Sequence, residues 1–177
     1  MPASSFAELY DFAGNFAAAA KAVLVADKAT LIGDDVLADT DAFIFGPREN
    51  LAMPPDRITV SATAFVQASD QQIKSTLNSE WFFAHFSGQL MVRVQTPRSE
   101  ATAAAEHAAR VGRIIFLMQP RARSFTTDNL PLYEILTLKL SGAPRAEYDD
   151  DEDVDFTELT FDVHLWILPG AFPETIS

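Results

Sequence analysis

Residues 96–119 constrain the fold of this chain most, because they are predicted to form one helix between two long strand-like stretches. Thr96 is a suitable N-cap, and Pro97 suits the first helical position, where its missing N–H would have had no partner. Pro120 then ends the helix. Apolar residues recur at spacings of three and four and predict a stripe that packs on a sheet, formed by Ala101, Ala104, Ala108, Val111, Ile115 and Met118.

A second amphipathic helix is predicted at the N-terminus. Ser5 and Glu8 have the spacing of a capping box, and the apolar positions that follow are Phe6, Leu9, Ala13, Phe16, Ala20 and Val23. The pair Gly14-Asn15 weakens the middle of this segment, since Gly costs about 1 kcal/mol relative to Ala in a helix. A helix that tolerates the pair is favoured over a kink.

Four segments alternate between apolar and polar residues and are predicted strands: 58–66, 80–95, 131–140 and 156–168. Gly88 lies where a β-bulge would bend the longest of them. Residues 67–79 are expected to form a long hairpin loop, Pro169 ends the last strand, and 171–177 form a short tail. Two strand pairs on either side of one helix predict an α+β fold, with an antiparallel or mixed sheet of four or more strands and helices on one face.

The whole chain, residues 1–177, is predicted to form a single domain. Residues 27–57 lack a period and are rich in turn residues, so they are expected to form a surface arm or an interface segment. No internal repeat or linker divides the chain.

Composition excludes several classes of function. The formal charge is −12, which argues against a protein that grips nucleic acid, although DNA could pass without being gripped. Without cysteine there is no disulfide, thiolate metal site or cysteine nucleophile. No uncharged apolar stretch of about 18 residues occurs and no signal peptide is visible, so we expect a soluble chain with no membrane association.

The acidic run at residues 147–155 is the first candidate metal site, because carboxylate oxygens bind hard cations. It lacks the glycine and the ligand spacing of an EF-hand, and a solvated hairpin loop is the favoured interpretation.

Histidines and arginines give no clear site. His85, His107 and His164 lie on separate predicted elements without ligand spacing, and His107 is interpreted as a surface helix residue. The arginines at 110, 113, 121 and 123 either pair with neighbouring copies or, as favoured, are solvated. No catalytic, cofactor-binding or metal-binding residue is assigned, no cofactor is implied, and no enzyme activity is expected.

Residues 88–94, 107–114, 130–135 and 157–163 carry a resemblance to a known family. Their segments, GQLMVRV, HAARVGRI, LPLYEI and TELTFDV, resemble tail terminator and tail-completion proteins of tailed bacteriophages, which belong with the head-tail connectors. The likeness is one of pattern and covers mostly residues 58–168.

The resemblance implies a virion structural protein that forms a ring, commonly a hexamer, where the tail tube meets the neck. The implied partners are other copies of the chain, the tail tube protein and a neck or head-completion protein, and DNA would pass through without specific binding. Assembly would occur in the host cytoplasm. Three alternatives stay open: another neck protein of the same fold, a cytoplasmic adaptor, and a metal-assisted hydrolase that uses the acidic run with His164.

Overall fold

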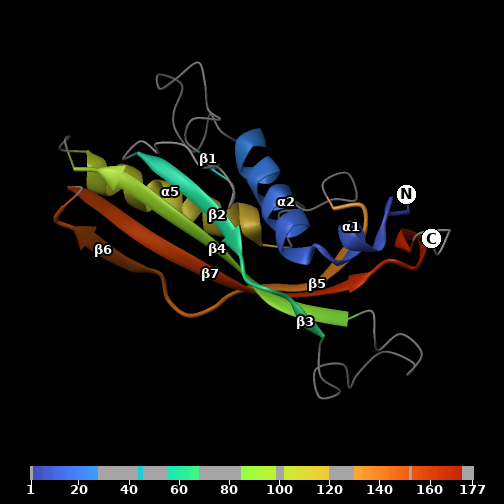
Figure 1. Ribbon diagram of the computed structural model, residues 1–177. Helices are drawn as coiled ribbons and strands as arrows, with labels where there is room; N and C mark the ends of the chain where they lie inside the picture. Colours follow the sequence, from blue (N-terminus) through green and yellow to red (C-terminus); the bar gives the residue numbers. More distant parts are fainter. Residues whose placement is uncertain are drawn as a thin grey trace.

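The computed structural model describes residues 2–27, 44–45, 56–67, 85–98, 102–119, 130–151 and 153–172. In these ranges three α-helices lie against one face of a seven-stranded sheet (Figure 1). The helices are α1 Phe6–Tyr10, α2 Phe12–Ala26 and α5 Ala103–Met118. The strands are β1 Ile44–Phe45, β2 Arg57–Ala62, β3 Val66–Gln67, β4 His85–Pro97, β5 Tyr133–Leu140, β6 Arg145–Asp149 and β7 Val154–Ile167, and a 3₁₀ turn, η4 Pro169–Ala171, follows.

Strands β4 and β7 form the axis of the sheet. They pair along the whole length of β4, from His85 opposite Trp166 to Pro97 opposite Val154. The strand order is β1-β2-β4-β7-β5, with β3 beside β4 and β6 beside β7. Only β1 and β2 pair in parallel among the described strands, so the sheet is mixed. The predicted α+β class, with helices on one face of the sheet, is confirmed.

The two faces of the sheet differ in polarity. The face beneath the helices carries apolar side chains from β4 and β7 that are at most 2% exposed: Leu90, Val92, Val94, Leu159, Phe161, Val163, Leu165 and Ile167. The alternation in the sequence predicted this face correctly. The opposite face, here called the open face, carries polar residues such as Gln89, Asp162 and His164.

The N-terminal segment is two helices and not one. Ser5 accepts a hydrogen bond from the Glu8 N–H at 3.2 Å, as predicted, but the chain breaks at Asp11. Asp11 caps α2 by accepting from the Gly14 N–H at 3.1 Å, and α2 then runs through Gly14-Asn15 without a kink. A local side-chain cap thus competes successfully with continuation of the first helix.

Gly88 pairs regularly with Val163 and does not form the predicted bulge. A Cβ there would lie 2.7 Å from the Phe65 ring, so the absence of a side chain at Gly88 lets this ring pack directly on the backbone of β4. The irregularity is on the neighbouring strand, where the three residues 63–65 oppose only two on β4. A bulge also interrupts β5 between Ile135 and Thr137.

Helix α5 begins six residues later than predicted, because its first helical residue is Ala103 and not Pro97. Thr96 and Pro97 are the last residues of β4, because Asp155 and Val154 of β7 extend the ladder to them. Thr102 is the N-cap residue instead, and its side chain makes no capping hydrogen bond.

The predicted stripe of α5 is also wrong, because the helix is rotated about its axis. Of the described residues of that stripe only Met118 is buried, while Ala104 and Ala108 are exposed. The buried residues of α5 are Ala103, His107, Arg110, Ile114, Leu117 and Met118.

Strand β6 was not predicted, since no strand was expected between residues 140 and 156 and residues 147–149 belong to the acidic run that was interpreted as a loop. Gly142, at φ 82°, turns the chain, and β6 then pairs with the first half of β7. The predicted end of β7 is correct, because η4 begins at Pro169. Most of the expected arm, the loop after β3 and residues 173–177 lie outside the described residues. No described helix has the length and apolar character needed to span a membrane.

Candidate functional site

The acidic run forms a well-bonded hairpin between β6 and β7. The Tyr148 hydroxyl donates to Asp153 at 2.9 Å, and the Asp151 N–H donates to Asp149 at 3.0 Å. Arg98 forms an ion pair with Asp155 at 2.6 Å and lies 3.9 Å from the centre of the Tyr148 ring. The run does form a hairpin, as predicted, but residues 147–149 and 154–155 belong to β6 and β7 and not to a loop.

The structure separates the two parts of the hydrolase alternative. His164 lies ten residues along β7 from Val154, where the acidic turn ends, which is about 33 Å of extended strand. Across the described ranges, no group of three or more histidines and carboxylates could hold a metal ion. A site that combines His164 with the acidic run is incompatible with this geometry within one chain.

His107 is buried and not on the surface, which corrects the prediction. Its side of α5 faces the sheet, and its Nδ1 and Nε2 hydrogen-bond to the hydroxyls of Thr96 at 2.9 Å and Thr157 at 2.8 Å. Burial lowers the pKa of His107, and nearby Arg110 adds to this effect while Asp155 opposes it. A neutral imidazole can hydrogen-bond to both hydroxyls, because one of its nitrogens donates and the other accepts.

Two arginines of α5 hold the two ends of the segment that was predicted to be an arm. Arg110, whose side chain is only 9% exposed, forms an ion pair with Asp56 just before β2 and a second hydrogen bond between Nη2 and Oδ2 at 3.3 Å. Arg113 binds Asp27 just after α2 through two hydrogen bonds of 2.6 and 3.0 Å. The favoured interpretation of these two arginines as solvated is wrong, while Arg121 and Arg123 lie outside the described residues.

The tertiary structure also brings together two histidines that are far apart in sequence. On the open face, the rings of His85 and His164 lie 5.7 Å apart, and Trp166 lies 5.9 Å from His85. Within the described part of the chain, both ring nitrogens of His85 and the Nε2 of His164 are buried without a hydrogen-bond partner. Burial lowers the pKa of each histidine, and the charge of His85 lowers that of His164 further.

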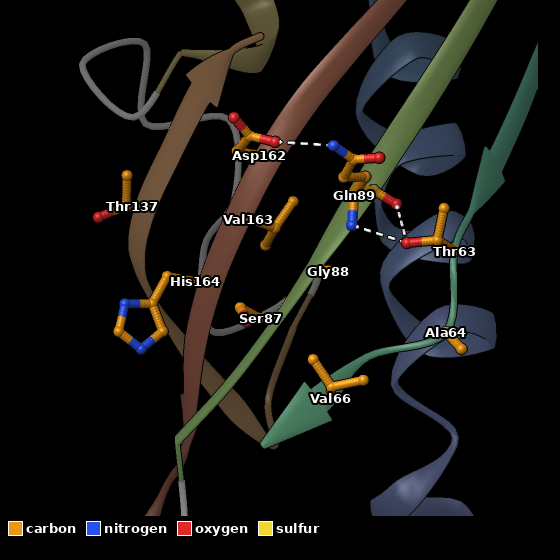
Figure 2. A pocket seen from close by; sticks show the side chains of 10 residues that line it. All are labelled: Thr63, Ala64, Val66, Ser87, Gly88, Gln89, Thr137, Asp162, Val163 and His164. Atoms are coloured by element: carbon orange, nitrogen blue, oxygen red, sulfur yellow. Dashed lines mark hydrogen bonds between the residues drawn. The ribbon is translucent and has the colours of Figure 1, made fainter. Parts of the chain in front are cut away.

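The described part of the open face carries a larger and a smaller depression. The larger, of about 580 Å³, is shown in Figure 2 and is lined by Thr63, Ser87, Gln89, Thr137, Asp162 and His164 among others. Within it, Gln89 donates from Nε2 to Asp162 at 2.9 Å and from its backbone N–H to Thr63 at 2.9 Å. These hydrogen bonds join β4, β7 and the segment between β2 and β3, so part of the polar lining of the depression is already paired.

The smaller depression, of about 270 Å³, lies on the same face toward the end of the sheet that carries the acidic hairpin. We call it the arginine hollow, and its polar lining consists of Arg57, Thr59, Ser61, Arg93, Gln95 and Glu158. The sequence alone did not indicate it. The alternation of β2 and β4 places these residues on one face, but only the pairing of Thr59 with Arg93, and of Arg93 with Glu158, brings them together.

Comparison with known proteins gives a similarity in structure but none to a family model or a curated protein. Among solved structures, this chain is similar to a chain of the "Virion of native gene transfer agent (GTA) particle", with a TM-score of 0.54 and 15% sequence identity. The similarity covers 89% of this chain and 97% of the other, so the two share a fold along nearly their whole lengths.

Proposed function

We propose that this protein is a structural subunit of a phage-like virion, and that it acts as a tail terminator. In this role, copies of the single domain form a ring at the head-proximal end of the tail tube and join the tube to the neck. The observation that carries the proposal is the shared fold with a chain of a gene transfer agent virion over 97% of that chain's length. The sequence resemblance to tail terminators supports the same assignment.

The surfaces of the protein are consistent with a role in which it acts by binding other subunits. Many described polar side chains are paired within the subunit, in the acidic hairpin, in the two arginine–aspartate pairs of α5 and in hydrogen bonds between strands. No described helix covers the open face, which is therefore available to a partner. An acidic subunit would also let DNA slide past, because a charge of −12 repels phosphate. The segment 27–57, held at both ends by arginines of α5, would contact neighbouring subunits or the adjoining neck and tail tube proteins.

Deletion of the gene, combined with cryo-electron microscopy of particles and of the purified protein, tests the proposal. We expect rings of the purified protein, density for this chain between tail tube and neck, and tails that fail to join heads in the deletion strain. Density at the head vertex alone would instead assign the chain to another head-tail connector of the same fold. A protein that is monomeric at every concentration and absent from particles would refute the virion role.

A further inference from the structure

His85, the first residue of β4, is buried and leaves both of its ring nitrogens unused. The residue is 1% exposed, and neither Nδ1 nor Nε2 has a hydrogen-bond partner in the described part of the chain. The indole N–H of Trp166, the cross-strand neighbour, donates instead to Glu134 at 2.6 Å. A buried polar group without a partner has lost its hydrogen bonds to water, so its presence in a native fold indicates a bound ion, ligand or water molecule.

His164, on the neighbouring strand β7, places a further unused nitrogen next to this ring. The centres of the two rings lie 5.7 Å apart, and the Nε2 of His164 is buried without a partner in the described ranges. The register explains this proximity, because His85 lies opposite Trp166 and His164 is two residues earlier on the same face of the sheet. The ladder of β4 and β7 runs unbroken from His85 to Pro97, so the strand pair fixes both backbones before any ligand binds.

The separation of the two rings suits a metal ion. Two imidazoles that bind one tetrahedral ion through bonds of about 2.0–2.1 Å have ring centres roughly 5–6 Å apart. The observed separation of 5.7 Å lies in this range. Imidazole nitrogen is a preferred ligand of zinc, copper and nickel, whereas calcium and magnesium prefer oxygen, so the pair favours a transition metal.

We propose that His85 and His164 bind one divalent transition-metal ion, such as Zn²⁺, with water molecules as its remaining ligands. His164 lines the larger depression (Figure 2), which gives the ion and its water ligands a route from solvent. The acidic hairpin lies too far along β7 to contribute a carboxylate from the same chain. The inference goes beyond the proposed function and does not depend on it.

A bound ion would act as a cross-link between the two central strands. It would tie the start of β4 to the end of β7, where the ladder of the sheet axis terminates at His85 and Trp166. Because the unfolded chain does not hold the two imidazoles together, the ion would stabilise the folded state in proportion to the logarithm of its free concentration above the dissociation constant.

Titration of ZnCl₂ into the whole chain, purified without a histidine tag and treated with a chelator, tests the site. We expect calorimetry to show one Zn²⁺ bound per chain and the melting temperature to rise with the Zn²⁺ concentration. His85→Phe keeps the volume of a ring but removes both nitrogens, and His164→Gln removes the second imidazole. Each variant should bind Zn²⁺ at least about tenfold more weakly, since even an outer-shell partner of a metal ligand typically contributes that much.

Two variants that leave the pair intact are the matched controls. His107→Gln removes a buried histidine whose two nitrogens are already hydrogen-bonded, and Asp150→Asn with Asp151→Asn removes exposed carboxylates of the acidic hairpin. Both should bind Zn²⁺ like the unmodified protein. Pulsed EPR of bound Cu²⁺ adds a signature that carboxylates do not give, because it detects coordinated imidazole; this signal should persist in both controls and weaken in His85→Phe.

Three results would overturn the site: no Zn²⁺ binding, binding that is unchanged in both His85→Phe and His164→Gln, or binding that disappears with the carboxylates of Asp150 and Asp151. Absence of binding would assign the unused nitrogens to buried water. Circular dichroism establishes that each variant folds, and His164→Gln, at a half-buried position, keeps the test valid if His85→Phe does not fold. The proposed function is tested separately, because the location of the chain in particles is measured without Zn²⁺.

Discussion

Helices α2 and α5 cover the same face of the sheet but are held by different forces. The buried side of α2 is entirely apolar, with Phe16, Ala20 and Leu24 at 0% exposure. The buried side of α5 mixes Ile114 and Met118 with His107 and Arg110, and places Phe116 in solvent at 57% exposure. Hydrophobic burial therefore positions α2, whereas directional hydrogen bonds and ion pairs set the rotation of α5.

The largest expected effect is on the α2 side. Phe16→Ala removes a fully buried ring that packs 6.1 Å from Phe65, and should lower the free energy of unfolding by about 3–5 kcal/mol. Urea denaturation followed by circular dichroism measures it. Phe116→Ala on α5 is the control and should change stability by less than about 0.5 kcal/mol, because the ring is mostly exposed. Equal losses would show that α5 is held by apolar packing after all.

On the α5 side, Arg110→Met should cost about 2–3 kcal/mol of unfolding free energy. It leaves Asp56, whose side chain is 23% exposed, without its cation and removes a contact to the Thr96 hydroxyl. Arg113→Met breaks the more exposed ion pair with Asp27 and should lower the unfolding free energy by less than about 1 kcal/mol. Chemical denaturation of both variants gives the ranking, and the reverse ranking would contradict the role assigned to Arg110.

Acidification should weaken the protein through its buried histidines. The folded-state pKa values of His85, His107 and His164 are lowered by burial, so below about pH 6.5 the unfolded chain binds more protons than the folded one. Stability is therefore full above pH 6.5 and falls as the pH drops through the folded pKa values, by at most about 1.4 kcal/mol per pH unit for each histidine.

Urea denaturation at pH 7.5 and 5.5 measures this dependence. His107→Gln on α5 should reduce it, because the amide retains hydrogen-bonding capacity without titrating in this range. Phe16→Leu on α2 should leave the pH dependence unchanged. The account of His107 fails if the His107→Gln variant loses as much stability on acidification as the unmodified protein.

The smallest effect concerns the two helix starts. Asp11→Ala removes the capping hydrogen bond to the Gly14 N–H and should lower the unfolding free energy by about 1 kcal/mol. Thr102→Ala at the start of α5 should cost only a few tenths of that, since the Thr102 hydroxyl bonds the Glu106 side chain and caps no N–H. A thermal melt of each variant, with Ser5→Ala as a second capping comparison, ranks them.

The same contrast explains which parts of the fold could be predicted from sequence. The alternation in β7 predicted its buried face, since Leu159, Val163 and Leu165 meet an apolar layer whichever helix supplies it. The small residues of α5 made a plausible stripe, but His107 and Arg110 found partners on β4, on β7 and beside β2, which no local pattern reveals. Thr96 carried a capping signal that strand pairing with Asp155 overrode.

Contacts between residues far apart in the sequence account for several further features that sequence analysis missed. The pair His85 and His164, the arginine hollow and the clamps at Asp27 and Asp56 each join residues from different elements. Proximity of this kind depends on strand register, which places His85 opposite Trp166 and Arg93 opposite Glu158. The acidic hairpin is the exception, because a block of like charges predicts its solvated turn locally.

By itself the sequence determined the α+β class, the apolar face of the central strands, the N-terminal cap and the acidic turn, because each follows from periodicity or charge within a few residues. Only the tertiary structure decided the rotation of α5, the extension of β4 to Pro97 and the make-up of the open face. Hydrogen bonds and ion pairs between distant residues are directional and short in range, so they take effect only once the fold has brought their partners together.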